Sequence, residues 1–172
     1  MGDIKIKLSH SGLKEGEYSF SFKIENDFFE QFDTSEFKKG NVQAGIVLYR
    51  RSRIIELEIM LKGKVEAECD LCLDLFEIPI SYKAKMYVKF GQNKDEENEE
   101  LIVVGENENE IDLTQYVYES ICLSVPYRKV HNENSDGTGG CNQAMIEKLQ
   151  QLSVKNEKQA DPRWDQLKNI KN

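Results

Sequence analysis

A long period-two alternation of apolar and charged residues through the middle of the chain limits the fold most strongly. From Ile55 to Cys69 every odd position except Gly63 is apolar, and every even position except Met60 is charged. Successive side chains of a β-strand point to opposite faces, so the pattern predicts a long strand with one buried face. The glycine within it predicts a bulge, a bend or a tight turn.

Weaker signals of the same kind extend this prediction to a mainly antiparallel sheet. Alternation predicts strands near residues 4–8, 18–24, 42–48 and 78–90. Three aromatic residues in 27–32 favour a helical turn or a loop plug over a strand. Helices are predicted over 113–123, capped by Asp112, after Asn142, and from Asp161-Pro162. The expected fold class is α+β, with a mainly antiparallel sheet in the front half, for which a barrel-like form is considered, and two or three helices in the back half.

The charge of the chain is concentrated in one region. Of the net charge of −8, residues 91–146 contribute −9, from 12 acidic and 3 basic side chains. We therefore expect a solvated acidic loop over 92–110 inside a single domain, 1–152, followed by a linker and a short helix in 153–172. No run of 18 apolar residues and no signal-peptide pattern occurs, so a cytoplasmic protein without a membrane partner is expected.

The Cys-x-x-Cys at the end of the long alternation is the clearest chemical motif. Cys69 and Cys72 supply half of a tetrahedral zinc site, and His131 and Cys141 in the downstream Gly-rich stretch can complete it. These four residues predict a structural zinc site of the Cys3His type. Two alternatives remain open at this point: a redox disulfide, or two small residues that pack in a strand and a turn.

No motif for hydrolytic or transfer chemistry is present. The chain has no P-loop, no His-Glu-x-x-His and only two histidines, and its carboxylates concentrate in the acidic loop. We therefore predict a protein that is not an enzyme.

Four blocks of sequence, in this order, carry a family resemblance. They are Gly63-Lys64-Val65-Glu66-Ala67-Glu68-Cys69-Asp70-Leu71-Cys72-Leu73, Glu110-Ile111-Asp112-Leu113, Leu123-Ser124-Val125-Pro126 and Asp161-Pro162-Arg163-Trp164. Together they resemble the YceD family of large ribosomal RNA subunit accumulation proteins. The resemblance implies a bacterial protein needed for accumulation of large-subunit ribosomal RNA. Many relatives carry further cysteine pairs after the Pro block, where this chain offers only His131 and Cys141.

Three functions are weighed from these observations. The first is a ribosome-biogenesis factor that supports accumulation or processing of large-subunit (23S) rRNA, on a precursor particle, directly or through a protein. The second is a protein-interaction adaptor with a zinc-stabilised fold and no RNA contact, and the third is a thiol oxidoreductase. Candidate residues for an RNA or partner surface are Arg50, Arg51, Arg53, Lys83, Lys85, Tyr87, Lys89 and Trp164. Trp164 is expected to dock in a groove rather than to stack on a base.

Overall fold

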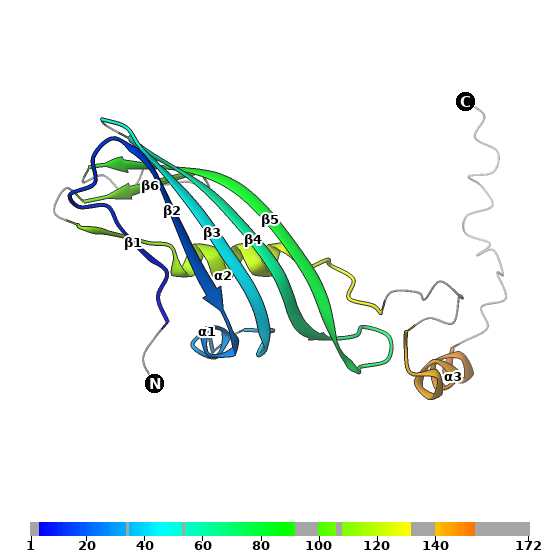
Figure 1. Cartoon of the computed structure of the whole chain (residues 1–172). Helices are drawn as coiled ribbons and strands as arrows, with labels where there is room; N and C mark the ends of the chain where they lie inside the picture. Colours follow the sequence, from blue (N-terminus) through cyan, green and yellow to red (C-terminus); the bar gives the residue numbers. More distant parts are fainter. Residues whose placement is uncertain are drawn as a thin grey trace, which may run out of the picture.

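The alternating segments form one curved, five-stranded sheet (Figure 1). A computed structural model describes residues 4–33, 35–52, 54–91, 100–105, 108–131 and 140–153. The strands, in spatial order, are β2 (Gly16–Ile24), β3 (Gly40–Arg50), β4 (Ile54–Glu68), β5 (Leu75–Phe90) and β6 (Leu101–Val104). Strands β2 to β5 pair antiparallel, and β6 runs parallel to β5. The predicted α+β class is confirmed.

The sheet is open rather than closed into a barrel. Its two edge strands, β2 and β6, do not pair with each other in the described residues. A separate two-stranded sheet joins β1 (Lys7–Ser9) to β7 (Glu110–Asp112). The strand predicted near residues 4–8 is therefore shorter than expected and pairs with a partner more than one hundred positions away, which local alternation does not reveal.

The buried face of the sheet is the one that the alternation predicted. In β4 the side chains of Ile55, Leu57, Ile59 and Leu61 are at most 2% exposed, and those of Val65 and Ala67 are also buried. The register aligns these residues with apolar partners on both sides, as in the row Ile46, Ile59 and Ala84. A continuous apolar surface thus runs across the inner face of the sheet, and its removal from water is the main stabilising term for the fold.

Two helices cover this inner face, and a third does not. Helix α1 (Asn26–Glu30) buries Phe28 and Phe29, which meet edge to face, so the predicted helical turn is confirmed. Helix α2 (Thr114–Ser124) buries Val117 and Ile121 and contacts β5. In Figure 1 α2 crosses behind the sheet and α1 lies at one end of it. Helix α3 (Gln143–Leu152) has no buried residue. The helix predicted from Asp161 lies outside the described residues.

The acidic region is not a loop throughout. Leu101 to Val104 form β6, and they pair with Tyr87 to Phe90 at the open end of the sheet. The side chains of Val103 and Val104 are 4% and 3% exposed. Burial of this short apolar segment, together with its hydrogen bonding to β5, outweighs the repulsion between the surrounding carboxylates, so the prediction of a solvated loop over 92–110 is wrong for these residues. Residues 92–99 and 106–107 lie outside the described part of the chain.

Gly63 is required by a close approach between backbones and not by a turn. Strand β4 passes through it in continuous register with Val42 and Ile80, so a bulge or a tight turn at this position is excluded. A Cβ atom at position 63 would lie 2.1 Å from the Asn41 carbonyl oxygen and 2.6 Å from the Val42 Cα. Only a glycine at position 63 lets the backbone of β3 lie this close to the backbone of β4. None of the described helices combines the length and the apolar character needed to cross a membrane.

Replacing Gly63 by alanine should destabilise the protein strongly. The new methyl group would meet backbone atoms that cannot rotate away, and we expect the free energy of unfolding in urea to fall by about 3 kcal/mol. Gly45→Ala is the matched control on β3, because its nearest neighbour, the Met60 carbonyl oxygen, lies 3.9 Å from the built Cβ. The control should change stability by no more than about 1 kcal/mol. Equal unfolding midpoints for the two variants would contradict this account of Gly63.

Candidate metal centre

The Cys-x-x-Cys forms a tight turn between β4 and β5. The Cys69 amide donates a hydrogen bond to the Asp74 carbonyl at 3.0 Å, and the Leu73 amide donates to the Cys69 carbonyl at 2.9 Å. Leu73 has a φ of 62°, in the left-handed region that allows the chain to reverse here. Both cysteine side chains are turned inward, with at most 1% exposure. The strand end therefore presents two buried thiols side by side.

A reciprocal pair of hydrogen bonds brings the segment after Pro126 to this turn. The Asp70 amide donates to the Lys129 carbonyl at 2.7 Å, and the Lys129 amide donates to Asp70 Oδ2 at 2.6 Å. The Lys129 ammonium also forms an ion pair with Glu36. Two residues further on, the His131 ring packs on Phe76 with a centroid separation of 4.4 Å. These contacts hold His131 against the two thiols.

The four predicted ligands lie in one cluster. The Sγ atoms of Cys69, Cys72 and Cys141 and a ring nitrogen of His131 all lie within 4.8 Å of one another. Cys69 Sγ is 3.7 Å from Cys141 Sγ, and His131 Nδ1 is 3.5 Å from Cys72 Sγ and 3.6 Å from Cys141 Sγ. The fourth cysteine, Cys122, is on α2 and is not a member of the cluster.

These separations fit a tetrahedral zinc ion. With Zn–S bonds of ~2.3 Å and a Zn–N bond of ~2.05 Å, tetrahedral angles place two sulfurs ~3.8 Å apart and a sulfur and a nitrogen ~3.6 Å apart. The observed distances agree with both values. Three thiolates and one imidazole would fill all four positions, which is the arrangement of a structural site rather than a catalytic one.

The pKa values of two thiols in the cluster, Cys69 and Cys141, are shifted in opposite directions. Burial raises the pKa of the Cys69 thiol, but hydrogen bonds from the backbone amides of Cys72, Leu71 and His131 outweigh it and bring the pKa to about 6. Burial and the shared hydrogen bonds with Cys69 and Cys72 raise the pKa of Cys141 to about 11. A thiolate at Cys69 thus disfavours ionisation of Cys141, and a divalent cation bound among the thiols would favour it.

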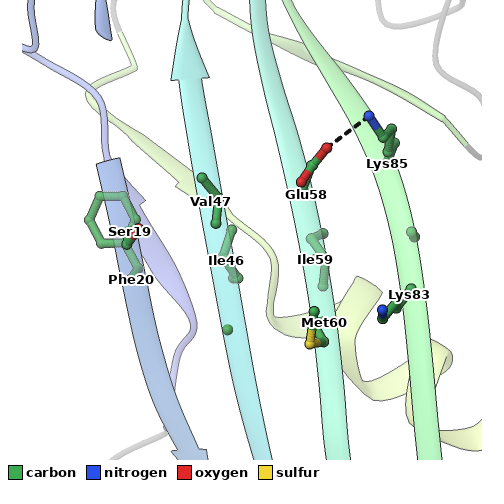
Figure 2. Close-up of a pocket in the computed structure, with 11 residues that line it drawn as sticks. Ser19, Phe20, Ile46, Val47, Glu58, Ile59, Met60, Lys83 and Lys85 are labelled. Carbon is green, nitrogen blue, oxygen red and sulfur yellow. Dashed lines mark ion pairs between the residues drawn. The ribbon is translucent and has the colours of Figure 1, made fainter. Parts of the chain in front are cut away.

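The predicted lysine face of β5 is exposed, but its charge is partly neutralised. Lys83, Lys85, Tyr87 and Lys89 share the outer face. Lys85 Nζ lies 2.8 Å from a Glu58 carboxylate oxygen, an ion pair between β5 and β4 that Figure 2 shows, and 3.4 Å from one of Glu56. Lys83 lies beside Met60 and makes no ion pair within the described residues. The sequence shows these lysines, but it does not show that Glu56 and Glu58 of the next strand lie close to Lys85.

Two of the three arginines predicted for an RNA or partner surface, Arg50 and Arg51, lie in the described part of the chain. Arg51 is exposed and lies 3.4 Å from a Glu56 carboxylate oxygen. Arg50 turns its guanidinium over the Phe90 ring, at 5.5 Å from the centroid. Arg53 and Trp164 lie outside the described residues, so their predicted roles stay predictions. Arg50 and Arg51 therefore have different surroundings, one over an aromatic ring and the other beside a carboxylate.

Asp70 and Lys129 are the positioning residues that sequence reasoning missed. Asp70 sits between the two cysteines, where an aspartate reads as an ordinary polar turn residue, and Lys129 has no neighbour that marks it. Their partnership joins positions 59 residues apart and acts largely through backbone atoms. No residue-type pattern announces such a contact.

Comparison with known proteins gives one result. The sequence matches, over residues 57–171, the family described as large ribosomal RNA subunit accumulation protein YceD. The matched span contains all four residues of the cluster. No match was found among curated proteins or among solved structures.

Removing the Asp70 carboxylate should loosen the segment that carries His131. In Asp70→Ala the Lys129 amide loses its acceptor, and the lost bond to a charged group predicts a local opening that is easier by about 1.5–3 kcal/mol. Hydrogen exchange should show faster exchange at residues 127–131 and unchanged exchange in β4. Asp74→Ala is the control, because only the backbone carbonyl of Asp74 is bonded to Cys69. Unaltered protection of Lys129 in Asp70→Ala would refute the positioning role.

Proposed function

This chain belongs to the YceD family, and on that premise we propose that it is a non-catalytic ribosome-biogenesis factor of the cytoplasm. It supports accumulation or processing of large-subunit (23S) rRNA by binding to a precursor of the large subunit. The observation that carries the proposal is the family match over residues 57–171, which includes the metal cluster, the lysine face and Trp164.

The cluster of Cys69, Cys72, His131 and Cys141 supports a structural zinc in this function. Bound there, zinc would supply charge neutralisation for the thiolates and a crosslink between distant segments, and no open coordination position for a substrate. The ion would fasten the segment after α2 to the end of β4, next to the Asp70–Lys129 contact. A four-ligand site also argues against the thiol oxidoreductase, since redox Cys-x-x-Cys motifs lie at a helix N-terminus and this one ends a strand.

The outer face of β4 and β5 is the surface that best fits contact with the precursor. Lys83 offers a cation without an ion pair in the described part of the sheet, and Tyr87 is 36% exposed on the same strand. An exposed cation binds a phosphate, and an exposed aromatic ring stacks on an unpaired base. Because Glu56 and Glu58 balance Lys85, we expect few phosphate contacts and a shallow salt dependence.

One observation favours the protein-interaction adaptor as the second candidate. Helix α3 carries Met145, Ile146, Leu149 and Leu152 on one face, yet none of its residues is buried. Leu123 in the last turn of α2 and Tyr127 after the helix are also exposed. Unpartnered apolar residues of this kind fit a protein groove better than a phosphate backbone.

The zinc proposal predicts a stoichiometric metal. Protein purified without chelator should contain about one equivalent of zinc by elemental analysis, as a single Cys3His site requires. Cys72→Ser should lose most of it, because the remaining three ligands bind far less tightly, whereas Cys122→Ser, which changes a thiol outside the cluster, should retain it. Less than about a tenth of an equivalent in the parent protein, with all four thiols freely reactive, would exclude the zinc site.

The biogenesis proposal predicts that the protein crosslinks to large-subunit precursor RNA. After crosslinking in growing cells, sequencing of the bound RNA should recover precursor large-subunit rRNA. Lys83→Glu should lower that yield, and in a binding titration it should reduce the slope of log affinity against log salt by about one. Lys14→Glu, an exposed lysine between β1 and β2, is the charge-matched control and should change neither.

The same experiment separates the two candidates. Recovery of one defined protein with no rRNA above background would overturn direct RNA contact and favour the adaptor. Recovery of rRNA with equal yields from Lys83→Glu and Lys14→Glu would exclude the outer face of β5 as the contact.

A further inference from the structure

A polar pocket lies at the end of the sheet opposite the Cys and His cluster. It encloses about 310 Å³ and is lined by His10, the Ser11–Gly12 turn, Arg50 at the end of β3, Phe90 at the end of β5, and Glu108 with its neighbour Asn109. This volume is at the lower end of the range for small-ligand pockets. Its walls come from four segments that are far apart in sequence, and none of them belongs to the metal cluster.

Two buried polar atoms in the walls of this pocket have no hydrogen-bond partner. They are Nε2 of His10 and a terminal guanidinium nitrogen, Nη1, of Arg50. The His10 side chain is more than nine-tenths buried, with 6% exposure of the residue. A buried polar atom without a partner costs about 1–3 kcal/mol, so two on one pocket indicate an occupant that satisfies them.

Arg50 also lacks a counter-charge. No carboxylate among the described residues forms an ion pair with it, although the neighbouring Arg51 has Glu56. Its guanidinium carbon lies 5.5 Å from the centroid of the Phe90 ring, and the His10 ring packs on the same phenyl group at 5.1 Å. A half-buried guanidinium supported only by an aromatic face is an incomplete ion pair.

The electrostatics of His10 point in the same direction. Burial lowers the pKa of His10, and the Arg50 charge lowers it further, while the backbone carbonyl and the carboxylate of Glu108 raise it. Arg50 and Glu108 are the charged groups that line this pocket around His10. An anion beside Arg50 would remove the repulsion and favour the protonated imidazole.

We propose that this pocket binds a phosphate group, held by the Arg50 guanidinium and a protonated His10. The planar guanidinium offers several N–H donors in the arrangement that matches phosphate oxygens, and imidazolium Nε2–H supplies a donor in place of the unpartnered lone pair. With both groups charged, the pocket carries two cations against the single carboxylate of Glu108. Arg50 is only partly buried, so rotation of its side chain suffices to present Nη1 to the phosphate.

The site does not depend on the proposed function. Its phosphate group has two sources, a free phosphate or mononucleotide and the backbone of a single-stranded RNA, and the chemistry that recognises either one is the same. Failure of rRNA binding through β5 would leave the pocket intact, since Lys83 is not among its residues.

The test is an NMR titration of the full-length protein. The chain has two histidines, His10 and His131, so the two imidazole signals are readily assigned. Without ligand, His10 should titrate below its usual pKa of 6.5. Saturating inorganic phosphate, 5′-uridine monophosphate or oligouridylate is added in separate series at constant ionic strength, with chloride as the reference anion. Binding beside Arg50 should raise the midpoint of the His10 titration by about one pH unit.

Variants identify the residue responsible. Arg50→Gln should weaken phosphate binding roughly 10- to 100-fold, since a bond to a charged group is lost, and Arg50→Lys should weaken it less. Arg51→Gln is the matched control, an exposed neighbour paired with Glu56, and should bind as the parent does.

The ligand series distinguishes the sources of the phosphate. A rise of the His10 midpoint with phosphate or the mononucleotide assigns the site to free phosphates, and a rise with oligouridylate alone assigns it to an RNA backbone. No rise with any ligand beyond that with chloride would overturn the site. Equal affinities of the parent and Arg50→Gln would do the same.

Discussion

The pairing of β4 with β3 and β5 along its whole length is the constraint on which the rest of the structure depends. It fixes the register that sends six apolar side chains of β4 inward, from Ile55 to Ala67, and it requires a glycine at position 63, where two backbones come within contact distance. A one-residue shift would turn every charged side chain of this strand into the core. The two candidate sites lie at the two ends of β4: the Cys and His cluster at one end and the pocket of His10 and Arg50 at the other.

At one end the strand places Cys69 at a buried corner, and a few backbone hydrogen bonds complete a cluster of Cys and His side chains that could hold a metal ion. Asp70 and Lys129 bond reciprocally through amide, carbonyl and carboxylate groups, so His131 arrives next to thiols that lie some sixty residues earlier. A metal ion bound there would add a crosslink between the segment after α2 and the end of β4. Metal binding and folding of this region would then be coupled.

Charge on the sheet is organised by pairs rather than by patches. Lys85 of β5 forms ion pairs with Glu56 and Glu58 of β4, so the outer surface is nearly balanced around Lys85, whereas Lys83 lies opposite Met60 and Tyr87 is exposed. At the other end of β4 the arrangement is reversed, because Arg50 is half-buried and has no carboxylate partner in the described residues. The lysines of β5 form the more evident charge pattern in the sequence, yet it is Arg50 that has no ion-pair partner among the described residues.

The sequence by itself determined the long strands, their buried face and the four Cys and His residues that form the candidate metal cluster, because alternation and ligand chemistry are local properties of the residue order. Ile55 to Ala67 needed no tertiary information to be placed inside. Only the tertiary structure decided what depends on distant partners: β6 inside the acidic region, the contact of β1 with β7, the Asp70–Lys129 bond and the position of Arg50 over Phe90. Each of these contacts joins segments that are brought together by packing of the whole sheet, and patterns of neighbouring residues in the sequence do not predict such contacts.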